Sequence, residues 1–272
     1  MKGHIVAMGG GGFSMEPENP LLEDYILSLA PRQPAKICFI PTASADSAPY
    51  LVKFYRAFSG RAIATDLTIS DTKSLQRRPS NTSEIRGYIA EQDIVYVGGG
   101  NTANLLAIWR AHGVDLALRE FWAQGKILCG ISAGMICWFQ DGLTDSFGRL
   151  LPLGDGLGFL DGSACPHYDG ESDRPEAYRK AIKEGMVPGY AADDGAAKPE
   201  TVNKRHRAEG ALHGPADGRA LVALSFRHKI FEPAVGPFRQ TKFKLEVKSA
   251  ICFFSYDISA VFSFRAVRLV HT

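Results

Sequence analysis

The order of apolar and amphipathic segments is the feature that most limits how this 272-residue chain can fold. Along its first two-thirds, short apolar runs alternate with stretches whose apolar residues recur every three or four positions. Continuous apolar strands separated by helices are typical of a parallel sheet buried on both faces. The sequence therefore predicts an α/β fold, a mostly parallel sheet with helices on both faces. The expected strands are 4–10, 35–44, 61–69, 93–99 and 126–131, and the expected helices are 20–30, 48–59, 83–92, 101–113 and 115–125.

Charge and hydropathy exclude several classes of function. The net charge of +2 argues against a dedicated nucleic-acid binder. No apolar run reaches the roughly 18 residues that a membrane span needs, and the first residues lack the apolar core of a signal peptide. We therefore expect a cytoplasmic protein that binds neither nucleic acid nor membranes. The scattered cysteines predict buried thiols rather than a metal site; they are Cys38, Cys129, Cys137, Cys165 and Cys252.

The composition changes after Ala197. Residues 198–272 contain 13 Lys and Arg against 6 Asp and Glu, whereas residues 1–197 contain 18 against 23. The basic segment opens with a polar stretch that lacks periodicity, and a β-prone stretch follows it. We therefore expect an α/β domain over 1–197 and an atypical basic extension of uncertain fold over 198–272.

One pentapeptide, Gly130-Ile131-Ser132-Ala133-Gly134, matches the nucleophile-elbow pattern G-x-S-x-G. An expected strand precedes it and an apolar, helix-like run from Met135 to Phe139 follows it. A nucleophile on such a turn has a strained backbone, so its neighbours must be small. The pattern predicts that Ser132 is a nucleophile and that the Ala133 N–H faces the developing oxyanion.

A second glycine-rich segment, "YVGGGNT" (96–102), follows the expected strand 93–99. Its glycines would allow a ligand to approach the backbone and would supply the other oxyanion donor. The alternative is a dinucleotide fingerprint, because Gly98, Gly100 and Ala103 fit G-x-G-x-x-A with Glu120 downstream. That alternative is disfavoured because Glu120 falls within an expected helix and not at the end of a strand.

A serine nucleophile needs a base and a carboxylate that orients the base. Of seven histidines, His167 is the expected base because it lies in a Gly- and Ser-rich loop. Asp145 is the expected acid because it gives the chain order Ser…Asp…His seen in hydrolases with an elbow. The alternatives left open are Asp141, Asp169 and Glu171.

Taken in order, "FIPTAS", "VGGGNT", the elbow and "CPHYD" resemble peptidase family S51, the peptidase E or aspartyl dipeptidase group. "MGGGGFS" and "GYAADDGAA" extend the resemblance over about residues 5–197. It implies the fold of class I glutamine amidotransferases, a flavodoxin-like arrangement. It also implies a cytosolic serine peptidase that releases N-terminal aspartate from small peptides without a metal or cofactor. The expected partner is therefore a small peptide, and a homodimer is left open.

The resemblance also assigns roles to residues. Ser132 would be the nucleophile and His167 the base, and Gly99 or Gly100 would form the oxyanion hole with Ala133. No glutamate lies between Ser132 and His167, which favours Asp145 by position and leaves Glu171 open. Three further residues are expected to bind substrate: Asn101 of the glycine-rich segment, and Arg174 and Arg179 as partners for a substrate carboxylate.

Two other functions stay open at this stage. An esterase or other acyl hydrolase would use the same three catalytic residues, and a non-catalytic homologue would bind a small molecule in a residual site. A glutamine amidotransferase is disfavoured because its elbow would present a thiol, whereas here it presents Ser132 and Cys129 lies in the preceding strand.

Overall fold

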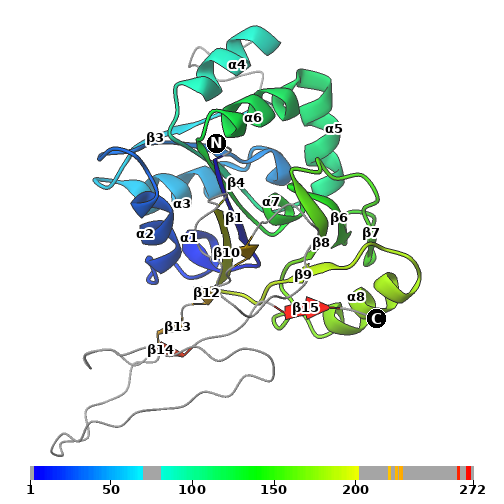
Figure 1. Cartoon of the computed structure of the whole chain (residues 1–272). Helices are drawn as coiled ribbons and strands as arrows, with labels where there is room; N and C mark the ends of the chain where they lie inside the picture. The colour runs from blue at the N-terminus through cyan, green and yellow to red at the C-terminus, as the bar shows by residue number, and fades with distance from the viewer. Residues whose placement is uncertain are drawn as a thin grey trace, which may run out of the picture.

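The computed structural model describes residues 3–69 and 81–201, with short strands at 220–221, 224–225, 227–228, 262–263 and 268–270. In this part of the chain the main sheet has eight strands in the order β11-β10-β1-β5-β4-β2-β3, with β12 beside β10. Strands β1 to β5 are mutually parallel, and β10 runs antiparallel to β1 (Figure 1). The strands are β1 (His4–Met8), β2 (Lys36–Ile40), β3 (Ile63–Asp66), β4 (Ile94–Val97), β5 (Ile127–Ile131), β10 (Ala196–Thr201), β11 (Ala220–Leu221) and β12 (Leu224–Ser225).

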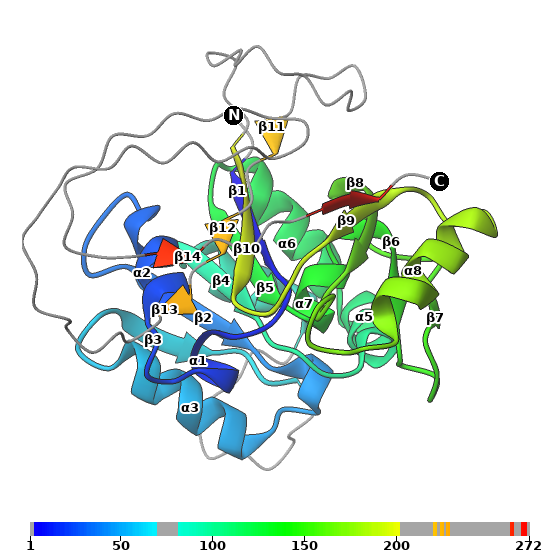
Figure 2. The same cartoon turned by 90° about the horizontal axis from the view of Figure 1, so that it is seen from below.

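Helices cover both faces of this sheet, as the alternation of segments predicts (Figure 2). Along β1, Val6 and Met8 pack into one core, and Ile5 and Ala7 pack into the other. The first core is closed by α1 (Gly12–Met15), α2 (Leu21–Ser28) and α3 (Ala48–Phe58). The second is closed by α4 (Thr82–Ala90), α5 (Thr102–His112) and α6 (Val114–Ala123), with the short 3-10 helix η1 (Thr42–Ser44) beside α5.

A second sheet lies beyond the main one in the order β15-β9-β8-β6-β7 (Figure 1). Helix α7 (Ala133–Ile136) connects β5 to this sheet, and α8 (Arg174–Lys183) packs against it. Its strands are β6 (Phe139–Thr144), β7 (Leu151–Pro152), β8 (Leu160–Cys165), β9 (Gly189–Ala191) and β15 (Arg268–Val270). Strands β13 (Arg227–His228) and β14 (Phe262–Ser263) pair with each other.

The apolar run after Ser132 was expected to be helical as far as Phe139, and this expectation is wrong. That helix has a single turn, and the chain enters β6 at Phe139. Trp138 and Phe139 are fully buried and pack into the core between the sheets, so tertiary packing overrides the helical pattern. The predicted boundary between residues 197 and 198 falls inside β10. Most of the β-prone stretch of the basic extension lies outside the described residues.

The same described residues contain no helix that is both long and apolar enough to cross a membrane.

Candidate active site

Ser132 occupies a strained turn at the carboxyl end of β5, between β1 and β4 near the middle of the sheet. Its backbone has φ 57° and ψ −112°, a combination that costs energy for any residue other than glycine. Its N–H donates to the carbonyl of Met8 at 3.1 Å, which ties the turn to β1. The structure therefore gives the predicted elbow the backbone geometry that such a nucleophile requires.

The two glycines of the elbow are required by close backbone contacts. A Cβ at Gly130 would lie 2.1 Å from the carbonyl oxygen of Gly134. A Cβ at Gly134 would lie 2.4 Å from the carbonyl oxygen of Val97 in β4. Strand β5, helix α7 and strand β4 can therefore pack this closely only because both positions lack a side chain.

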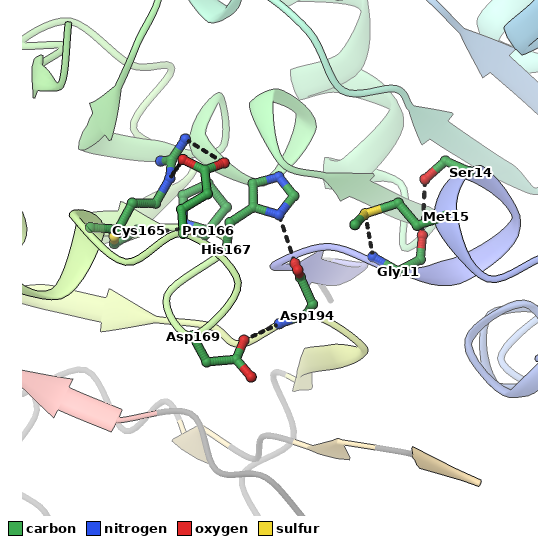
Figure 3. A network of polar contacts seen from close by, with 10 residues as sticks. Gly11, Ser14, Met15, Cys165, Pro166, His167, Asp169 and Asp194 are labelled. Atoms are coloured by element: carbon green, nitrogen blue, oxygen red, sulfur yellow. Dashed lines mark hydrogen bonds and ion pairs between the residues drawn. The ribbon is translucent and has the colours of Figure 1, made fainter.

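His167 is presented by the loop that follows β8 in the second sheet. It also has a positive φ, 51°, and its side chain is only 14% exposed. Its Nδ1 lies 2.6 Å from Oδ1 of Asp194, whose side chain is 15% exposed (Figure 3). A carboxylate at Nδ1 fixes the ring orientation and leaves Nε2 to act on another group.

Asp194 is itself tightly positioned in the segment that follows β9. Its N–H donates to Oδ1 of Asp169 at 2.9 Å (Figure 3), and its backbone bridges to Gly10 beyond β1. A Cβ at Gly10 would lie 1.9 Å from Asp194 Oδ1 and 2.6 Å from His167 Nδ1. A Cβ at Gly170 would lie 2.2 Å from Asp194 Oδ2. The hydrogen-bonded His167–Asp194 pair therefore occupies space that these two glycines leave open.

The expectation that Asp145 is the carboxylate behind His167 is wrong in this structure. Asp145 is exposed after β6, in a turn where its carbonyl accepts from the N–H of Gly148. The alternatives also have other roles, since Asp141 accepts from the N–H groups of Gly142 and Gly154. Glu171 pairs with Arg174 at 2.7 Å. The chain order is therefore Ser…His…Asp. The expected order failed because Asp194 contacts His167 from the segment that follows β9, the strand beside β8.

Ser132 and His167 line one cavity of about 390 Å³. The walls come from the turn α1, from the start of α3, from the loop after β4 and from the elbow. The lining residues are Ser14, Met15, Ser47, Pro49, Tyr50, Lys53, Gly99, Ile131, Ser132 and His167. A cavity of this size suits a small ligand.

The expected oxyanion donors differ in their placement. A Cβ at Gly99 would lie 3.2 Å from Cβ of Ser132, and the Gly99 N–H donates to the Tyr50 hydroxyl at 3.3 Å. Ala133 is the first residue of α7, where a backbone N–H has no partner within the helix. Gly100 has φ 137° and packs against Ala43, whose carbonyl oxygen would lie 2.2 Å from an added Cβ. Gly99 and Ala133 therefore lie next to Ser132. Gly100 packs instead against η1.

None of the three residues expected to bind substrate lines the cavity. Asn101 caps α5, accepting from the N–H of Asn104 at 2.9 Å and donating to the carbonyl of Ser146 at 3.0 Å. Arg174 is 3% exposed and bonds Glu171 and the carbonyl of Leu143. Arg179 is exposed on α8. In this structure Asn101 serves as a helix cap, Arg174 is held in an ion pair and Arg179 is exposed, so the cavity does not support the predicted substrate contacts.

Tyr50 and Lys53 are among the cavity residues that were not predicted from the sequence. Both belong to α3, but the Tyr50 ring packs on Phe13 and Phe39 of the core, whereas Lys53 lies on the exposed side of the helix. Burial raises the pKa of the Tyr50 hydroxyl, which stays neutral at physiological pH. Neither residue had a distinctive sequence signal, because a tyrosine on the core side of an amphipathic helix and a lysine on its exposed side are both ordinary.

Thiols and metal ligands do not gather at this site. Cys129 is fully buried in β5 and its Sγ donates to the carbonyl of Val95 at 3.4 Å. Burial raises the pKa of Cys129 well above its usual range, and raises that of Cys165 to about 12. Within the described ranges, no three His, Cys, Asp or Glu side chains are grouped so that they could hold a metal ion.

Comparison with known sequences supports the motif-based resemblance. A family model described as Peptidase family S51 matches residues 5–198. The chain is 52% identical over 194 residues to the uncharacterized peptidase YgaJ of Bacillus subtilis (strain 168), a match that covers 71% of this chain and 81% of that protein. It is 31% identical over 159 residues to the uncharacterized peptidase Lmo0363 of Listeria monocytogenes, covering 55% of this chain and 72% of that protein.

Two crystal structures share the fold. A putative peptidase E protein from Listeria monocytogenes EGD-e superposes with a TM-score of 0.54 at 22% identity, over 73% of this chain and 94% of that one. A peptidase from an acI-B1 Actinobacterium superposes with a TM-score of 0.56 at 16% identity, over 73% and 83%. At these identities the similarity establishes the architecture.

Proposed function

The chain belongs to peptidase family S51, and from this premise we propose that it is a serine peptidase with Ser132 as nucleophile, His167 as base and Asp194 as the orienting acid. One observation supports these roles most directly. Ser132 on its strained elbow and His167, held by Asp194 at 2.6 Å, line the same cavity. Family membership alone supports a peptidase, and this geometry supports the serine mechanism.

The proposed reaction follows from the position of each group. His167 takes the proton from the Ser132 hydroxyl as the oxygen attacks the peptide carbonyl, and Asp194 stabilises the imidazolium that forms. The N–H groups of Ala133 and Gly99 stabilise the tetrahedral oxyanion. Gly99 would exchange its long bond to Tyr50 for one to the oxyanion. His167 then protonates the leaving amine, and water hydrolyses the acyl-enzyme by the same steps.

We propose small peptides with an N-terminal aspartate, such as aspartyl dipeptides, as substrates. The size of the cavity favours a short peptide, and its lining includes a cation but no carboxylate. The four described cysteines are free and buried, which supports a reducing, cytoplasmic location.

Hydrolysis of a substrate panel tests this function. The panel contains Asp-Leu, Asn-Leu, Ala-Leu and a short-chain ester, each offered to the wild type and to Ser132→Ala. We expect the wild type to cleave Asp-Leu fastest and Ser132→Ala to lose at least roughly a thousandfold in kcat. Undiminished cleavage by Ser132→Ala would refute the serine mechanism, and exclusive cleavage of the ester would identify an esterase instead.

A further inference from the structure

We propose that Lys53 of α3 binds a carboxylate of the peptide substrate and thereby sets the specificity of the cavity. The inference rests on the proposed peptidase function and identifies the residue that selects its substrate. The two arginines of α8 predicted for this role lie elsewhere, since Arg174 is buried in an ion pair with Glu171 and Arg179 does not line the cavity.

Lys53 is held at the wall of the cavity that contains Ser132 and His167. Its Nζ donates to the carbonyl of Ser14, in α1, at 2.9 Å. This bond joins α3 to α1 across one side of the cavity. An ammonium group has three donors, so two remain for a ligand.

The charges around the cavity favour an anion. Lys53 is the single Lys or Arg among the lining residues, and none of them is Asp or Glu. Within the part of the chain that the structure describes, Lys53 forms no ion pair with an acid. A carboxylate that enters the cavity therefore meets one positive charge that no protein acid has neutralised, and a charge-assisted hydrogen bond to it is stronger than a neutral one.

A dipeptide offers two carboxylates, the side chain of an N-terminal aspartate and the C-terminal carboxylate. Both present the same chemistry to Lys53. Peptides that remove one carboxylate at a time distinguish them: Asn-Leu lacks the side-chain carboxylate, and Asp-Leu-amide lacks the terminal one.

The experiment measures kcat/KM on Asp-Leu, Asn-Leu and Asp-Leu-amide for the wild type, Lys53→Met and Lys53→Arg. We expect Lys53→Met to lower kcat/KM for Asp-Leu about tenfold, the effect of losing one charge-assisted hydrogen bond. The peptide that already lacks the recognised carboxylate should change less than twofold, and Lys53→Arg should retain most of the activity. Loss of the Asp-over-Asn preference assigns Lys53 to the side chain, and loss of the acid-over-amide preference assigns it to the C-terminus.

Arg56→Met is the matched control, because Arg56 is an exposed cation on the same helix that does not line the cavity. Arg56→Met should leave kcat/KM unchanged for all three peptides. An equal loss on all three peptides in Lys53→Met, or no loss on any of them, would overturn the proposal.

A binding measurement separates this inference from the proposed function. Calorimetry measures the affinity for Asp-Leu of Ser132→Ala and of the double variant Ser132→Ala/Lys53→Met. Both lack the proposed nucleophile, so the peptide is not hydrolysed during the measurement. We expect the second substitution to weaken binding about tenfold. If the wild type fails to hydrolyse peptides but this difference persists, the peptidase mechanism fails and the Lys53 site stands. If hydrolysis depends on Ser132 and the two affinities are equal, the Lys53 site fails alone.

Discussion

Asp194 orients His167 from a space bounded by two glycines, Gly10 and Gly170. Its Oδ1 lies 2.6 Å from His167 Nδ1, and its two carboxylate oxygens lie where side chains at Gly10 and Gly170 would project. Its backbone N–H is bonded to Asp169. The residue is therefore fixed from several directions, which is what an orienting carboxylate requires.

We predict that Asp194→Asn lowers kcat roughly 10³- to 10⁴-fold, because the amide would favour the wrong imidazole tautomer. Asp145→Asn should retain activity within twofold, since Asp145 is exposed. Steady-state kinetics on Asp-Leu, with circular dichroism to verify folding, measures both. The reverse ranking of the two variants would assign the acid to Asp145 after all.

Gly10→Ala tests the same carboxylate without changing its chemistry. The added Cβ would lie 1.9 Å from Asp194 Oδ1, so the Asp194 carboxylate and the His167 ring must shift. The expected result is a loss of kcat in a folded protein. Full activity would mean that the position of Asp194 is unimportant.

At the scale of elements, the turn α1 is held by a buried carboxylate of α2. Glu23 is 1% exposed, and its Oε1 accepts the N–H of Phe13 at 2.8 Å. Burial raises the pKa of Glu23 above its ordinary value, although hydrogen bonds from backbone N–H groups and the charge of Arg61 act in the opposite direction. Because α1 supplies Ser14 and Met15 to the cavity wall, this contact links the core to the active site.

A raised carboxyl pKa means that the folded state binds the proton more tightly than the unfolded chain. The free energy of unfolding therefore falls as pH rises from the ordinary pKa of 4.5 through the raised value. We predict that Glu23→Gln, which keeps an acceptor oxygen, reduces this fall and is at least as stable as the wild type at pH 8. Urea unfolding at pH 5 and pH 8 measures the difference. An equal fall in both proteins would contradict the prediction.

Elements with strong local patterns were predictable from the sequence, and those defined by long-range packing were not. Four of the five parallel strands, β1, β2, β4 and β5, are buried apolar runs, and Gly113, with φ 71°, ends α5. The strands of the second sheet are short and contain small or polar residues, so they resemble loops in sequence. The helix predicted over 83–92 begins at Thr82, where the Asn81 side chain caps it by accepting from the N–H of Glu84. Neighbouring caps of similar chemistry differ too little for sequence to separate them.

For the whole molecule, the architecture explains why every residue of the proposed catalytic site except Asp194 was predictable from the sequence. Ser132, Ala133 and Gly99 follow strands of the main sheet, and parallel strands bring their carboxyl ends to one edge. His167 and Asp194 come from the second sheet, where β8 and β9 lie side by side. The partnership of His167 with Asp194 depends on this pairing, which no local pattern reveals. Lys53 was missed because an exposed lysine on a helix usually faces only water.

The family match ends at residue 198, close to the predicted boundary at 197. The division into a domain over 1–197 and an extension over 198–272 stays a prediction, and so does the homodimer. Sedimentation of the purified chain would determine its oligomeric state.

Covalent labelling tests the central claim, a serine nucleophile activated by His167 and Asp194, most directly. A fluorophosphonate probe is reacted with the wild type, Ser132→Ala, His167→Ala, Asp194→Asn and Asp145→Asn, and the modified peptide is located by mass spectrometry. We predict modification at Ser132 in the wild type and in Asp145→Asn, much slower labelling in His167→Ala and Asp194→Asn, and none in Ser132→Ala. Absence of label from Ser132 in the folded wild type, or undiminished labelling of that serine without His167, would contradict the account.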